Sequence, residues 1–176
     1  MEGFGRRLKE LRQTAKITQS DLADKLNLHP QTVSKWERGL SEPDIAQLGE
    51  LAAALGISLE MLLGREEAEI SYVGTFRAEA FGKMLSELRA GRGESQDALA
   101  AAALTSPDAV SRWERGITCP DIERLSALAE HFEVPVSKLY CGYSEAPAAE
   151  SVAFIKKRKR ISAVSIAAAA ILLLAG

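Results

Sequence analysis

The feature that most constrains this chain is an internal repeat. Residues 4–64 align without a gap on residues 81–141, an offset of 77 residues, and 23 of the 61 aligned positions are identical. This period is longer than the roughly 20–50 residues of a solenoid unit. The sequence therefore contains a duplicated domain, here called copy one (4–64) and copy two (81–141).

The identities are densest in two runs of the repeat. Ser34-Lys-Trp-Glu-Arg-Gly39 aligns with Ser111-Arg-Trp-Glu-Arg-Gly116, and Pro43-Asp-Ile45 aligns with Pro120-Asp-Ile122. The composition around them is rich in Ala, Leu, Glu and Arg and poor in Val and Thr. Unbranched side chains lose little rotamer freedom on a helix, so this mixture favours helices over sheets.

Hydrophobic residues within each copy follow the spacing of α-helices. Phe4 and Leu8 lie on one stripe, Thr18 and Asp21 have the spacing of a capping box, and Pro30 occupies a first-turn position. We therefore predict an all-α fold of two tandem five-helix bundles plus a hydrophobic C-terminal helix. The predicted segments are a first domain (1–64), a linker (65–80), a second domain (81–142), a second linker (143–155) and a basic run followed by a hydrophobic helix (156–176).

A short turn and a small residue at the helix crossing are typical of a helix-turn-helix. The string Thr18-Gln-x-x-Leu-Ala-x-x-Leu-Asn-Leu28, followed by Val33-Ser-Lys-Trp-Glu-Arg-Gly39 and Pro43, closely resembles the Cro/phage-repressor (Xre-type) helix-turn-helix family. The resemblance covers both copies. It implies lambda-repressor-like bundles whose third helix, near 30–38 and 107–115, enters the major groove of DNA.

The same resemblance assigns roles to single residues. Base edges are expected to be contacted by Gln31, Thr32 and Lys35 in copy one and by Asp108 and Arg112 in copy two. Phosphates are expected to be contacted by Gln19, Ser34, Arg38, Gln96, Ser111 and Arg115. The pairs Arg12–Glu37 and Arg89–Glu114 are expected to join helix one to helix three, and Trp36 and Trp113 are expected to pack in the core.

Copy two departs from the pattern at the turn and at the base-contacting positions. Leu104 replaces Asn27, and a branched side chain resists the positive φ of a tight turn. Asp108 replaces Gln31, and its carboxylate repels neighbouring phosphates although it can accept a hydrogen bond from cytosine. We expect copy two to bind DNA more weakly than copy one. The alternative is a dimerisation or partner-binding module that kept the fold.

The C-terminal residues carry a second signal. A run of five basic residues, 156–160, precedes sixteen uncharged residues, 161–176. These features favour a short tail anchor or a transmembrane helix, with the DNA-binding domains on the cytoplasmic face of the cell membrane. The basic run alternatively contacts DNA or acts as a nuclear localisation signal, and the hydrophobic run alternatively packs on a copy or mediates self-association.

Composition restricts the remaining function classes. The net charge of −2 gives no bulk attraction to nucleic acid, so binding must come from local clusters. Cys119, Cys141 and His131 lack the short spacing of zinc ligands, and reduced thiols are the better interpretation. No nucleophile–base constellation or phosphate loop is evident, so neither an enzyme nor a cofactor nor a metal is expected.

The sequence thus predicts a regulator, specifically a repressor, that binds double-stranded DNA through two tandem domains. One chain could occupy two half-sites about one helical turn apart, roughly 34 Å, and homodimerisation is the other way to reach two half-sites. The alternative function is a protein-interaction adaptor or scaffold that uses the helix-turn-helix fold without specific DNA binding.

Overall fold

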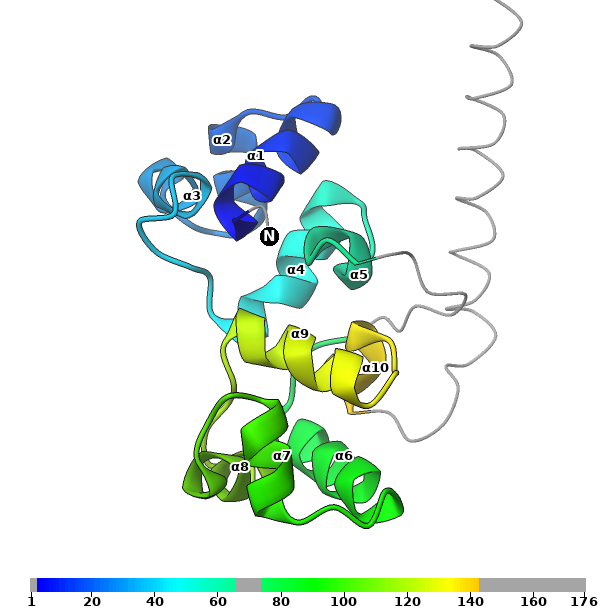
Figure 1. Cartoon of the computed structure of the whole chain (residues 1–176). Helices are drawn as coiled ribbons and strands as arrows, with labels where there is room; N and C mark the ends of the chain where they lie inside the picture. Colours follow the sequence, from blue (N-terminus) through cyan, green and yellow to red (C-terminus); the bar gives the residue numbers. More distant parts are fainter. Residues whose placement is uncertain (1–2, 66–73, 143–176) are drawn as a thin grey trace, which may run out of the picture. The chain divides into compact units, whose positions relative to one another are not determined.

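A computed structural model describes residues 3–65 and 74–142, which belong to one compact unit, Met1–Ser144 (Figure 1). These residues form helices and loops, with no strand among them. Copy one consists of α1 (Phe4–Thr14), α2 (Gln19–Lys25), α3 (Pro30–Glu37), the 3₁₀ helix η1 (Ile45–Gln47), α4 (Leu48–Leu55) and α5 (Leu59–Leu62). Copy two consists of α6 (Ala78–Gly91), α7 (Gln96–Ala102), α8 (Pro107–Glu114), α9 (Ile122–His131) and α10 (Val136–Cys141).

The two copies share their backbone down to single turns. Four pairs of residues with positive φ occupy aligned positions, among them Asn27 (φ 54°) and Leu104 (φ 50°). Leu104 therefore adopts the left-handed conformation that its branched side chain disfavours. The turn between α7 and α8 is preserved, and the predicted all-α tandem architecture is confirmed.

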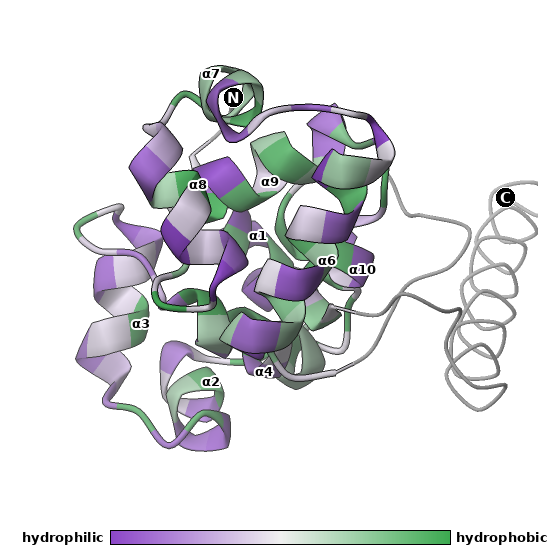
Figure 2. Cartoon of the chain, turned by 90° about the horizontal axis from the view of Figure 1, so that it is seen from below, coloured by the Kyte–Doolittle hydropathy of each residue, from purple (hydrophilic) through white to green (hydrophobic). Residues whose placement is uncertain are grey.

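The core of each copy is assembled from the inward faces of its helices. Hydrophobic and hydrophilic residues occupy different faces of these helices (Figure 2). Leu8, Leu22 and Val33 are fully buried in copy one, as are their counterparts Leu85, Leu99 and Val110 in copy two. Burial of a Leu or Val side chain contributes roughly 1.5–3 kcal/mol. This packing holds the helix-turn-helix pair of each copy against its first and fourth helices.

Residues 76–80, at the end of the predicted linker, are part of the folded second copy. The sequence predicts a connector over 65–80, whereas α6 already begins at Ala78 and Phe76 packs against hydrophobic side chains. The Phe76 ring lies 5.6 Å from that of Phe81 and 5.3 Å from that of Tyr140, measured between ring centroids. The repeat begins at Phe81, and α6 extends beyond the repeat to begin at Ala78.

The predicted C-terminal elements, which are the linker 143–155 and the basic and hydrophobic segment 156–176, lie outside the described residues. Over residues 3–65 and 74–142, none of the helices has the length and hydrophobicity needed to cross a membrane.

Candidate nucleic-acid interface

The third helix of each copy lies unusually close to the first. A Cβ atom on Gly5 would lie 2.2 Å from the carbonyl oxygen of Trp36, and one on Gly82 would lie 2.4 Å from that of Trp113. Only glycine permits this approach. These two glycines set the distance between the helices. Their identity at aligned positions of the repeat is the sequence feature that could have identified them, although they were not among the predicted site residues.

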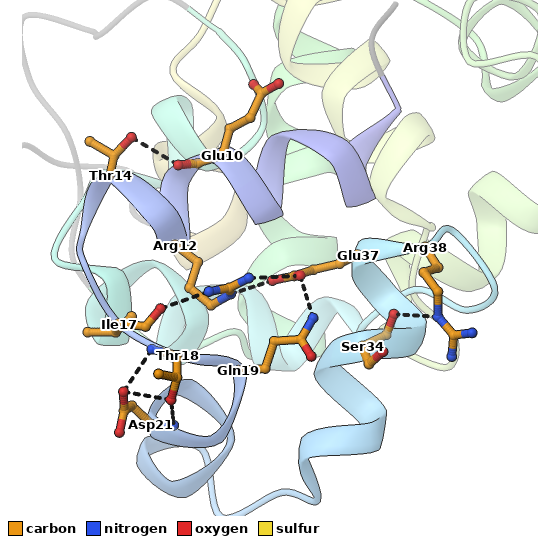
Figure 3. A network of polar contacts seen from close by, with 10 residues as sticks. All are labelled: Glu10, Arg12, Thr14, Ile17, Thr18, Gln19, Asp21, Ser34, Glu37 and Arg38. Atoms are coloured by element: carbon orange, nitrogen blue, oxygen red, sulfur yellow. Dashed lines mark hydrogen bonds and ion pairs between the residues drawn. The ribbon is translucent and has the colours of Figure 1, made fainter.

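A polar network then fixes the orientation of α3 (Figure 3). Arg12 on α1 donates from Nε and Nη2 to the Glu37 carboxylate, at 2.6 and 3.1 Å. Its Nη1 donates to the carbonyl of Ile17 at 2.8 Å, and Gln19 Nε2 donates to Glu37 at 2.6 Å. Arg12 and Glu37 are both buried. The network therefore ties α1, α2 and α3 together at one point.

The charges of this network stabilise one another. Burial by itself would raise the pKa of Glu37, but hydrogen bonds from Arg12 and Gln19 hold that pKa below its usual value. The hydrogen bond to Glu37 raises the pKa of Arg12 in turn. Both groups are therefore ionised at neutral pH.

Copy two carries the same network at the aligned positions. Arg89 donates to Glu114 at 2.5 and 3.1 Å and to the carbonyl of Glu94 at 2.8 Å. Gln96 Nε2 donates to Glu114 at 2.8 Å. The Arg–Glu pairs expected from the resemblance are thus present in both copies, and Trp36 and Trp113 are buried beside them.

The helix-turn-helix itself is closed by local contacts. Thr18 and Asp21 form the predicted capping box at the start of α2, which lowers the pKa of Asp21 through its hydrogen bond with Thr18. Ala23 is fully buried where α2 meets α3, a position at which a larger side chain would separate the helices. Asn27 makes the turn with positive φ. The sequence thus places α3 rigidly at the surface.

The outer face of α3 carries the side chains predicted to contact bases. Gln31 and Lys35 are exposed and one turn apart, and Thr32 is half-buried beside them. The Arg38 side chain folds back so that Nε donates to the carbonyl of Ser34 at 3.2 Å. This arrangement presents an amide and an ammonium group on the exposed face of α3, and their contacts with bases stay predictions.

The corresponding face of copy two is different. Arg112 forms an ion pair with Asp108 one turn earlier on α8, and the Arg112 hydrogen bond holds the pKa of Asp108 below its usual value. Leu104, at the turn before this helix, is 83% exposed. The two side chains expected to contact bases therefore engage each other, beside an exposed hydrophobic residue.

The residues predicted to contact phosphate divide into two groups. Ser34 and Ser111 are half-buried on the third helices, and Arg115 repeats the Arg38 contact with a 3.2 Å hydrogen bond to the carbonyl of Ser111. Gln19 donates one amide N–H to Glu37, and Gln96 donates one to Glu114. Each amide group has a second N–H in addition to the one it donates there. Their phosphate contacts stay predictions.

Of the two histidines, His29 is the N-cap residue of α3, next to this surface. Cys119 is exposed, Cys141 is buried, and both are free thiols. His131 Nε2 lies 2.8 Å from a Glu94 carboxylate oxygen. Over 3–65 and 74–142, no group of three potential metal ligands comes together.

Comparison with known proteins places both copies. The sequence profile of the family described as helix-turn-helix matches residues 8–62 and 85–139, more than half of the chain. The transcriptional regulator ImmR of Bacillus subtilis is 41% identical over 64 residues, which is 36% of this chain and 50% of that protein. The immunity repressor of Bacillus phage phi105 is 37% identical over 62 residues, 35% of this chain and 43% of the repressor.

A eukaryotic relative carries a different name. Multiprotein-bridging factor 1 of Debaryomyces hansenii is 40% identical over 55 residues, which is 31% of this chain and 37% of that protein. The chain thus spans about half the length, or less, of these three relatives.

Proposed function

The chain belongs to the helix-turn-helix family, matched once in each copy, and on that basis we propose that it is a sequence-specific DNA-binding transcriptional regulator of the repressor type. In this proposal α3 enters the major groove, with Gln31 contacting adenine and Lys35 contacting guanine. Gln19, Ser34 and Arg38 contact the flanking phosphates.

One observation carries the proposal. The buried network of Arg12, Glu37 and Gln19 fixes α3 on two other helices while Gln31 and Lys35 remain exposed. Base recognition requires this combination, because a bidentate contact to a base edge tolerates little movement of the helix that carries it.

The test is selection of random duplex DNA on the full chain, followed by affinity measurements at several salt concentrations. Gln31→Ala and Lys35→Ala are each expected to weaken binding to the selected sequence by about 1–3 kcal/mol. Gln13→Ala and Lys83→Ala, exposed residues on the first helices of the two copies, are matched controls. Absence of any enriched sequence would refute the proposal.

Copy two supports a second candidate function, that of a protein-binding adaptor. The Asp108–Arg112 ion pair and the exposed Leu104 are unfavourable for base contact and suitable for contact with a protein. The similarity to a protein named multiprotein-bridging factor 1 points the same way. A selected DNA sequence with one half-site only would favour this role for copy two, and two half-sites would favour DNA contact by both.

Membrane attachment through 156–176 is a separate part of the proposal, supported by the basic run followed by sixteen uncharged residues. It would hold the DNA-binding copies on the cytoplasmic side of the membrane. Flotation of the full chain with lipid vesicles tests it, with a version ending at residue 155 as the control. Equal flotation of both would refute attachment through this segment.

A further inference from the structure

The two copies contact each other through aligned positions of the repeat. Glu60 on α5 accepts hydrogen bonds from the backbone N–H of Ser137, at 2.9 Å, and from its hydroxyl. These residues are 77 positions apart, which is the offset of the repeat. A position that contacts its own counterpart lies on the axis that relates two copies. Glu60 and Ser137 therefore mark a twofold pseudosymmetry axis.

The surrounding contacts are reciprocal. The Tyr140 hydroxyl, near the end of α10, accepts from Gly49 N at 3.0 Å and donates to the carbonyl of Ala46 at 3.1 Å. Arg65, just after α5, donates to the carbonyl of Ser126 at 2.8 Å. Ser126 is the counterpart of Gly49. The end of each copy thus reaches the same position of the other copy's fourth helix, as in an isologous dimer.

The residues that the two copies place at the axis differ chemically, and they favour the pairing of copy one with copy two. Glu60 is 2% exposed and Ser137 is fully buried. If copy one paired with copy one of a second chain, Glu60 would meet a second Glu60, and two buried carboxylates repel. A Cβ at position 49 would lie 3.0 Å from the Gly74 carbonyl oxygen and 3.1 Å from the Tyr140 hydroxyl, so the glycine of copy one fits against this tyrosine more readily than the serine of copy two would.

Copy two also depends on copy one for a helix cap. Ser58 caps α5 by accepting from Met61 N, but the aligned residue in copy two is Pro135, which has no side-chain cap contact. Glu60 instead accepts from a neighbouring N–H in the first turn of α10, that of Ser137. The second copy is therefore completed by the first.

We propose that Glu60, Ser137, Gly49 and Tyr140 restrict pairing to copy one with copy two, and that the two copies of one chain pair with each other, as in the structure, so that a single chain is a complete dimer equivalent. With the proposed DNA-binding function as a premise, one chain occupies one two-part site whose halves differ in sequence. Figure 1 shows α3 and α8 along one side of the unit, one in each copy. Their base-contacting residues differ, so the two halves are not interchangeable.

The pairing can be tested without DNA through the thiol of Cys141, which lies buried in α10. In a Cys119→Ser background, labelling of Cys141 by an aromatic disulfide reports opening of this interface. Ser137→Glu places a second carboxylate at the axis and is expected to speed labelling at least tenfold. Adding Glu60→Ser exchanges the two groups across the axis and should return the rate to within about threefold of the parent.

Two further measurements complete the test. Tyr140→Leu introduces the residue that copy one has at the aligned position, and it should also speed the labelling of Cys141. This variant replaces Ser137→Glu in the test if Ser137→Glu does not fold. The thermal midpoint of the full chain, measured in neutral detergent, should be unchanged over a hundredfold range of concentration, because an intramolecular pairing does not depend on it. The inference would be overturned if Glu60→Ser and Ser137→Glu changed the labelling rate of Cys141 independently of each other. A thermal midpoint that rises with protein concentration would also overturn it.

On DNA, the full chain is mixed with a version lengthened by an N-terminal tag and bound to the selected sequence. One chain per site gives two bands in a gel-shift experiment, whereas two chains per site add a hybrid band between them. A hybrid band would refute the single-chain pairing while leaving DNA recognition intact. Coupling at the axis without any DNA binding would instead refute the proposed function alone.

Discussion

Replacing Glu37 with glutamine should destabilise the protein more than the same change at Glu114. The Glu37 side chain is 1% exposed and its partner Arg12 is 10% exposed, against 8% and 18% for Glu114 and Arg89. Removing one charge of a buried pair leaves the other without compensation, which costs about 3–5 kcal/mol. In the more accessible copy-two pair water can solvate the arginine, and about 1–3 kcal/mol is expected.

Urea denaturation of the full chain measures this difference. With a slope of about 1–3 kcal/mol per molar urea, Glu37→Gln should lower the midpoint by more than about 1 M without changing the slope. Glu42→Gln, at an exposed glutamate, is the control and should change the free energy of unfolding by less than about 0.5 kcal/mol. Adding Arg12→Met to Glu37→Gln should cost much less than the two changes summed.

The loss of stability in Glu37→Gln is expected to depend on pH. The pKa of Glu37 lies lower in the folded protein than in the unfolded chain. Its contribution is therefore complete above the unfolded value, roughly pH 4.3, and is lost as pH falls through the folded value. The stability difference between parent and Glu37→Gln should be constant near neutral pH and shrink in acid. Equal losses of unfolding free energy in Glu37→Gln and Glu114→Gln would refute this account of the network. So would a stability difference between the parent and Glu37→Gln that does not shrink in acid.

Three further outcomes follow from the structure. Leu104→Asn should raise the free energy of unfolding by about 1 kcal/mol, because Leu104 has φ 50° and is 83% exposed, and urea denaturation measures the gain. Asp108→Ala releases Arg112 from its ion pair, so affinity for random duplex should rise, with the slope of log affinity against log salt steeper by about one unit. Of the two thiols, Cys119 should react at once with an aromatic disulfide, whereas burial raises the pKa of Cys141 to about 12 and should delay its reaction until the protein opens.

The fold was predictable because every signal for it is local or repeated. The capping box at Thr18, the proline at the start of α3 and the hydrophobic spacing each depend on neighbouring residues, and the structure has these elements where the sequence places them. The offset of 77 residues then assigned copy two helix by helix. The resemblance to known helix-turn-helix proteins supplied the Arg12–Glu37 pairing, which joins residues 25 positions apart.

The contact between copies was not predictable in the same way. Glu60 reads as an ordinary exposed glutamate on a short helix, and burial of a carboxylate is expected only with a partner that the sequence does not reveal. The segment 65–80 was predicted only as a linker, and nothing in its sequence indicates that the two copies contact each other. The signal in hindsight is a difference between aligned positions, since Pro135 has lost the cap that Ser58 provides.

Duplication within one chain explains why such unequal groups can meet at the axis. In a dimer of identical chains, whatever lies on the twofold axis meets itself, so a buried carboxylate there is always opposed by another. Fusion of the two copies removes that restriction and lets each side of the axis change separately. Glu60 opposite Ser137, at aligned positions of the repeat, is a combination that a dimer of identical chains cannot have. The same freedom applies to α3 and α8, whose different outer residues would in a homodimer be forced to match.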